Sequence, residues 1–128
     1  MAQSSGTFTG AFDPCPDTPN CVSTQAKPAD EEHYLAPIPI TGDPDAALAK
    51  AIEVLTEMPR TKLVEQQGDY ARLEARSLIF RFVDDIELYL DRENGVLHAR
   101  SAARVGRSDL GVNRKRMNEF VAELKTRL

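Results

Sequence analysis

Charged side chains recur at alternating positions along the strands that the second half of the sequence predicts. Alternate residues of a strand share one face, so these side chains would form one charged surface. Its members are Arg72, Glu74, Arg76, Asp85, Glu87, Asp91, His98, Arg100 and Arg104. Opposite charges across strands stabilise a sheet by a few tenths to about 1 kcal/mol per pair without any ligand. Aligned arginines and acids can equally hold a polar ligand or a partner's strand, and both interpretations stay open.

A second group of cations follows in the segment 104–116, which leads into the last predicted helix. Three cations in the first turn of that helix oppose its macrodipole, at roughly 0.3–1 kcal/mol each when exposed. An anion held by free backbone N–H groups and by arginines would offset this cost. On that hypothesis Arg107, Asn113 and Arg114 join Arg100, Arg104 and Asp85 as candidate residues for binding a ligand or a partner.

The same segment has a structural interpretation. Nearby acids, Asp84 or Asp109, would neutralise the cations, and Asn113 or Ser108 would cap the helix. The segment contains neither the Gly-x-x-x-x-Gly-Lys phosphate loop nor the Gly-x-Gly-x-x-Gly fingerprint. It therefore predicts no nucleotide cofactor.

Asp84 and Asp85 are adjacent, so on a strand they project to opposite faces and cannot form a close carboxylate pair. The alternation places Asp84 on the core side, where a buried acid needs a partner. Arg114 or Arg81 could supply it, and we expect a structural salt bridge between Asp84 and Arg114. A catalytic acid with a raised pKa is the alternative.

The two cysteines, Cys15 and Cys21, flank a turn-forming segment that contains Pro16 and Pro19. A disulfide closing so short a ring contributes roughly 2–2.5 kcal/mol. Free thiols and a reactive thiol remain alternatives, although two thiols alone make a poor zinc site. The histidines, His33 and His98, belong to no recognisable nucleophile pattern. We therefore predict no metal and no catalytic set.

The composition excludes several classes of protein. The net charge of −4 argues against a general nucleic-acid binder, which usually carries a basic excess. No run approaches the roughly 20 apolar residues of a membrane-spanning helix. Residues 1–6 lack the basic start and apolar stretch of a secretory signal. An extracytoplasmic location would therefore require that a targeting segment has been removed, and otherwise we expect a cytoplasmic protein.

Residues 1–32 are rich in small and turn-forming types without apolar periodicity, which predicts an irregular cysteine-bearing arm before an α+β domain at 33–128. The prolines in Tyr34–Ile40 allow an edge strand at most. Asp43 and Pro44 mark a helix start, and Pro59 ends that helix.

Four strands then form two hairpins, one across Gly68-Asp69 and one around Asn94-Gly95. A two-residue turn at Asn94-Gly95 would set Tyr89 opposite Arg100, and a four-residue turn would set Glu87 there. A helix from about Asn113 closes the chain. The order β-α-β-β-β-β-α predicts a two-layer sandwich, with two helices on one face of an antiparallel sheet of four to five strands and a charged opposite face.

Three segments resemble the domain-of-unknown-function family 1499 of bacteria, cyanobacteria and plastids: Cys15–Ser23, Arg81–Glu87 and Arg100–Arg114. The family carries no established activity and no catalytic residues to transfer. The resemblance implies an extracytoplasmic setting, since similar members carry export or lipoprotein signals or lumenal transit peptides. It thereby favours a Cys15–Cys21 disulfide.

The leading hypothesis is a non-enzymatic binding or assembly module for a protein or a small polar or anionic ligand. The main alternative is a small hydrolase or transferase that uses Asp84 or Asp85 near Ser101, with arginines holding an anionic substrate. A structural accessory domain is the third possibility.

Overall fold

In the computed structural model, which describes residues 8–79 and 81–128, one antiparallel sheet is packed against two helices. The elements follow the chain as β1 (Cys21–Ser23), β2 (Ile38–Pro39), α1 (Pro44–Thr56), β3 (Thr61–Gln67), β4 (Tyr70–Arg76), β5 (Val83–Asp91), β6 (Val96–Ala103) and α2 (Val112–Arg127). Within the described residues the sheet has six strands. Five of them pair in the order β1-β6-β5-β4-β3, and β2 also pairs with β6. The predicted α+β sandwich is confirmed, with more strands than expected.

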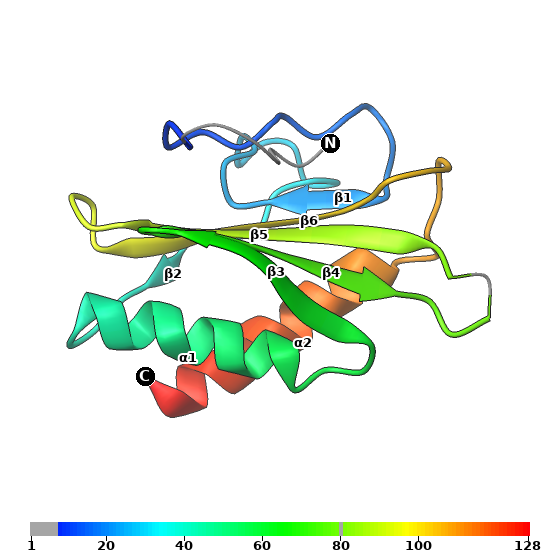
Figure 1. The fold of residues 1–128 in the computed structure, drawn as a ribbon. Helices are drawn as coiled ribbons and strands as arrows, with labels where there is room; N and C mark the ends of the chain where they lie inside the picture. Colours follow the sequence, from blue (N-terminus) through cyan, green and yellow to red (C-terminus); the bar gives the residue numbers. More distant parts are fainter. Residues whose placement is uncertain (1–7, 80) are drawn as a thin grey trace.

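Both helices lie on one face of the sheet, and the N-terminal segment before β2 passes over the other (Figure 1). Asp43 caps α1 by accepting a hydrogen bond from the Asp45 amide, and Pro44 is its first residue. The core between helices and sheet is built from alternate strand residues and one stripe of each helix. Its fully buried members include Leu55, Leu73, Ile86, Leu88, Leu90, Leu97, Met117, Phe120 and Leu124.

The two hairpins form where the sequence predicts them. Gln67 pairs with Tyr70 across the first turn. In the second hairpin Glu87 pairs with Arg100 and Asp91 with Val96, which is the register of the four-residue turn. Either register keeps the apolar residues on the helix side, so patterning alone does not choose between them.

The N-terminal segment departs from the expected irregular arm. Cys21–Ser23 forms β1, whose Val22 pairs with Ser101 and packs in the core. Three residues are too few for alternation to predict a strand. This segment also covers part of the sheet face that we expected to be left open and charged (Figure 1). The division at residue 32 between an arm and a domain stays a prediction.

Candidate functional site

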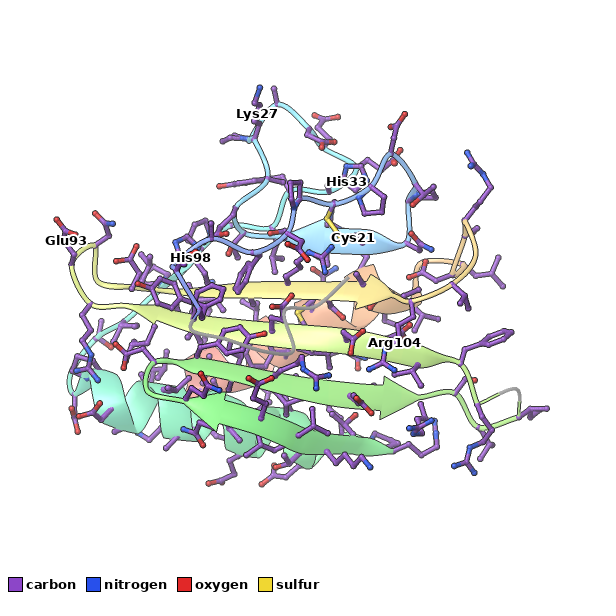
Figure 2. All side chains as sticks on the ribbon, turned by 45° about the horizontal axis from the view of Figure 1, so that its top comes forward. Cys21, Lys27, His33, Glu93, His98 and Arg104 are labelled. Carbon is purple, nitrogen blue, oxygen red and sulfur yellow. A yellow bond between two sulfur atoms is a disulfide. The ribbon has the colours of Figure 1, made fainter. Side chains whose placement is uncertain are left out.

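A pocket of about 600 Å³ lies where the cysteine loop meets the face of the sheet opposite the helices. The loop contributes one wall, the strands β4 to β6 the floor, and the segment after β6 another wall. Figure 2 brings this face forward, with Cys21 on β1 and Arg104 over the strands. The lining residues are Pro16, Thr18, Asn20, Arg72, Asp85, Arg100, Ala102, Ala103, Arg104, Gly106 and Arg107.

The cysteine loop is fixed at several points. Cys15 and Cys21 form a disulfide with their Cα atoms 5.7 Å apart. Asn20 donates from Nδ2 to the Gly106 carbonyl at 2.9 Å, which ties the loop to the opposite wall. Behind the loop, Nε2 of buried His33 lies 2.7 Å from the Thr18 carbonyl oxygen. The wall that carries Pro16 and Thr18 is therefore held by covalent and polar contacts.

A ladder of ion pairs crosses the floor of the pocket. Arg104 donates to both carboxylate oxygens of Asp85, at 2.7 and 2.8 Å, and to Glu74 at 2.7 Å. Arg72 donates to Glu74 at 3.1 Å and to Asp85 at 3.3 Å. Burial opposes ionisation of Glu74, but the hydrogen bonds from Arg72 and Arg104 outweigh it and lower its pKa. Asp85 therefore fixes two arginines at the edge of the pocket.

Arg100 lies deeper, with only 1% of its surface exposed. Its Nη1 atom is 3.7 Å from Oε1 of buried Glu87, and its Nη2 donates a long bond of 3.4 Å to the Pro14 carbonyl. Its Nε and Nη1 atoms have no hydrogen-bond acceptor within residues 8–79 and 81–128. Buried guanidinium donors without acceptors are rare and costly. Arg100 therefore lines the pocket and has two hydrogen-bond donors that the described residues do not satisfy.

Glu87 itself is held from the other side. Tyr70 donates from its hydroxyl to Glu87 Oε2 at 2.6 Å. Burial, followed by this hydrogen bond and the negative charge of Glu87, raises the pKa of Tyr70, so the hydroxyl keeps its proton and remains a donor. Glu87 is therefore oriented by Tyr70, and one of its oxygens is turned toward Arg100.

The predicted binding residues divide between two places. Asp85, Arg100, Arg104 and Arg107 meet in the pocket, where Arg107 is exposed. Asn113 and Arg114 lie at the start of α2, on the other side of the sheet, and are not among the lining residues. Arg114 donates to the carbonyls of Glu31, Glu32 and Tyr34.

A second polar cluster surrounds Asn113 on the helix side. Ser101 Oγ donates to Asn113 Oδ1, and Arg116 donates to the same oxygen at 2.8 Å. The partner of Asp84 is Arg116, at 3.0 Å, and not the expected Arg114. The reason is helical geometry, because a shift of two positions turns a side chain to nearly the opposite side of the helix. Asp84 does lie on the helix side, as the alternation predicts.

The start of α2 is capped by a carboxylate. Asp109 accepts from the amides of Gly111 and Asn113, both at 2.9 Å, and from Asn113 Nδ2 at 2.7 Å. Burial opposes ionisation of Asp109, but these donors outweigh it and lower its pKa. Asp109 therefore serves this helix terminus as the structural interpretation expects, and no bound anion is needed there. The predicted cap is wrong, because the N-cap residue is Gly111 and neither Asn113 nor Ser108.

The residues of the hydrolase alternative do not meet in the pocket, although Arg116 contacts both Ser101 Oγ, at 3.2 Å, and Asp84, at 3.0 Å, on the helix side. Asp84 and Asp85 belong to opposite faces, and only Asp85 lines the pocket. Ser101 is fully buried beside Asn113, on the side away from the pocket. The described residues contain no group of three or more His, Cys, Asp or Glu that could hold a metal ion.

Sequence reasoning assigned no pocket role to Arg72 or to the loop residues Pro16, Thr18 and Asn20. The signal for Arg72 was present, because it belongs to the charged face. The loop residues carried no such signal in the sequence, since nothing local shows that residue 20 contacts residue 106.

Comparisons with known proteins identify the family of the chain. Across the described residues, no helix combines the length and the apolar character needed to cross a membrane. No curated protein and no solved structure matches the chain. The model of one family, described as "Protein of unknown function (DUF1499)", matches residues 11–124, which include both polar clusters and the cysteine loop. The chain therefore belongs to the DUF1499 family of proteins of unknown function.

Proposed function

We propose that this domain is a non-enzymatic binding module that takes a small anionic ligand, a carboxylate or a phosphate, in the pocket beside the cysteine loop. The observation that carries the proposal is Arg100, which lines the pocket and has two buried nitrogen atoms that lack acceptors within the described residues. An anion bound from the pocket side would supply acceptors to this guanidinium. Charge-assisted bonds of this kind are stronger than neutral ones.

The charge of the lining supports an anion over a cation. Four arginines and one carboxylate line the pocket, and that carboxylate, Asp85, is already bound by Arg104 and Arg72. The volume of about 600 Å³ falls within the usual range of roughly 300–1,000 Å³ for small-molecule sites. Arginine also suits an anionic ligand, because its planar guanidinium can donate two parallel hydrogen bonds to a pair of carboxylate or phosphate oxygens.

The absence of an assembled nucleophile favours binding over catalysis among the residues described. The charged side chains that line the pocket with Arg100 include Arg72, Asp85 and Arg104, which are already engaged in ion pairs. Such a set can orient and neutralise an anion, but it offers neither a free base nor a free nucleophile.

The test is a titration with inorganic phosphate and with acetate, followed by ¹H–¹⁵N spectra of the arginine Nε–Hε groups. We expect the Arg100 signal to shift on saturation. The Arg107→Ala variant should weaken binding about fivefold, as expected for one exposed charged contact, and should unfold at the wild-type temperature. Lys27→Ala, an exposed cation on the N-terminal segment outside the pocket, is the matched control and should bind normally.

Arg100→Lys completes the experiment. It keeps a positive charge near Glu87 but loses the guanidinium fork, so binding should fall by more than the Arg107→Ala variant shows. Unchanged Arg100 signals with both anions, or equal binding by Arg100→Lys and wild type, would contradict the proposal.

A further inference from the structure

Among the described residues, five of the eight large apolar side chains left exposed belong to two loops at one end of the molecule. Leu78, Ile79 and Phe82 belong to the loop between β4 and β5, and Val105 and Leu110 to the segment after β6. Ile79 is 79% exposed and Leu110 is 96% exposed. Apolar side chains grouped in this way mark interaction surfaces, whereas scattered ones need no explanation.

Backbone contacts hold the two loops next to each other. The Ser77 amide donates to the Phe82 carbonyl at 2.9 Å, which closes the first loop. The Arg104 amide donates to the Val83 carbonyl at 3.1 Å, so the second segment leaves the sheet beside the first. Figure 1 shows both loops projecting from the end of the sheet opposite the C-terminus. We call this group of five apolar side chains the apolar tip.

Cations line a cavity beside the β4–β5 loop of the apolar tip. This second cavity, of about 500 Å³, is lined by Arg60, Lys62, Arg76 and Arg81. Its carboxylate, Glu74, is already bound by Arg72 and Arg104 and also lies 3.5 Å from Arg76. The chain carries a net charge of −4, so this concentration of positive charge runs against its overall balance.

We propose that this end of the domain docks on the surface of an anionic lipid bilayer. The apolar tip enters the boundary between headgroups and acyl chains, and the cavity cations bind lipid phosphates. Each part is weak alone, since stable attachment to a membrane surface needs two signals, such as apolar insertion and a basic patch. The tip and the cavity supply both at one end of the molecule.

The charge around the tip favours a lipid surface over a protein. The central part of a protein interface is depleted of charged residues as a whole, including Lys, Glu and Asp, although Arg is enriched there. Here four cations line a cavity beside the apolar residues. An anionic bilayer presents the complementary arrangement, a layer of anionic headgroups over hydrocarbon. The proposal is independent of the anion pocket, because none of its cavity cations lines that pocket.

The test is co-sedimentation of the whole chain with vesicles of phosphatidylglycerol and phosphatidylcholine in equal amounts, and with vesicles of phosphatidylcholine alone. We expect binding to the anionic vesicles only, and loss of binding at high salt. The double variant Arg81→Gln with Lys62→Gln should bind roughly 25-fold more weakly, at about fivefold per cation. Leu78→Ser with Ile79→Ser should bind about tenfold more weakly.

Matched controls lie elsewhere on the surface. Leu63 and Val64 are exposed apolar residues of β3, and Lys125 is an exposed cation in the last turn of α2. Leu63→Ser with Val64→Ser, and Lys125→Gln, should bind like the wild type. Failure of the intact chain to bind anionic vesicles would overturn the proposal and leave the tip as a contact for a protein. Equal binding to both vesicle types, or equal losses in the controls, would also overturn it.

Discussion

Arg100 and Ser101 are neighbours on β6, yet their side chains enter two polar clusters that differ in one respect. Ser101 faces the helices and joins Asn113 and Arg116, where donors and acceptors match closely. Arg100 faces the N-terminal segment, and two of its nitrogen atoms have no acceptor in the part of the chain that the structure describes. Both side chains are buried, so burial does not separate them.

This difference suggests how to distinguish buried polar residues that stabilise the fold from buried polar residues that can bind a ligand. A matched buried network stabilises one arrangement of the chain and has no capacity left for a ligand. A buried charge with unmatched donors beside a cavity costs stability in the free protein and retains that capacity. The helix-side cluster therefore fits a structural role, and the pocket side is where we propose that a ligand binds.

Glu87→Ala should give the largest effect. It removes the carboxylate nearest to Arg100 and leaves a buried positive charge, which costs about 3–5 kcal/mol of unfolding free energy. Urea denaturation measures this loss. Added phosphate should stabilise the variant, since a ligand that binds only the folded state raises the unfolding free energy.

Glu87→Gln is the control for that variant. It keeps an acceptor for the Tyr70 hydroxyl while removing the charge, so it should be destabilised less than Glu87→Ala. Equal stability of wild type and Glu87→Ala would show that Arg100 is not dependent on this carboxylate. The buried charge of Arg100 would then carry no measurable cost in stability, and the two faces of β6 would not differ in this respect.

Asn113→Ala should give the next largest effect, on the other side of the sheet. It removes the acceptor shared by Ser101 and Arg116 and one donor to Asp109, at about 1–3 kcal/mol for the groups left unsatisfied. Phosphate affinity should stay at the wild-type value, because Asn113 does not line the pocket. A loss of phosphate binding in a folded Asn113→Ala protein would mean that the two clusters are coupled.

The elements were predictable where local chemistry determines them. Asp43 and Pro44 start α1, and the Gly68-Asp69 and Asn94-Gly95 segments turn the two hairpins. The alternation around Ile86 also placed Asp84 on the helix side. These features depend on residues a few positions apart, whose side-chain directions follow from strand and helix geometry.

The contacts of the site were less predictable, because they join residues far apart in the chain. Asn20 bonds to the Gly106 carbonyl, and Arg100 bonds to the Pro14 carbonyl. No periodicity encodes such pairs, and β1 is too short to reveal that its segment joins the sheet. The partner of Asp84 was misplaced by two positions because Arg114 and Arg116 both lie near the start of α2.

The smallest expected effect concerns the wall of the pocket and its dependence on pH. The imidazole of His33 lies 2.7 Å from both the Thr18 carbonyl oxygen and the Asp30 carboxylate. Burial opposes its protonation, but these hydrogen bonds outweigh burial and raise the pKa of His33 above 6.5. A raised folded-state pKa adds stability below the unfolded value, and this contribution is lost as the pH rises through the folded value.

The unfolding free energy should therefore decline from about pH 6 toward pH 8 more steeply in the wild type than in His33→Gln. Burial lowers the pKa of His98, which gives an opposite trend in both proteins, so only the difference between their curves reports His33. Asp30→Asn should flatten the curve in the same way, because it removes the carboxylate that favours the imidazolium. Parallel curves for wild type and His33→Gln would show that the loop carrying Thr18 is held by the disulfide and Asn20 without a charged His33. In that case the pocket wall would be insensitive to pH between about 6 and 8.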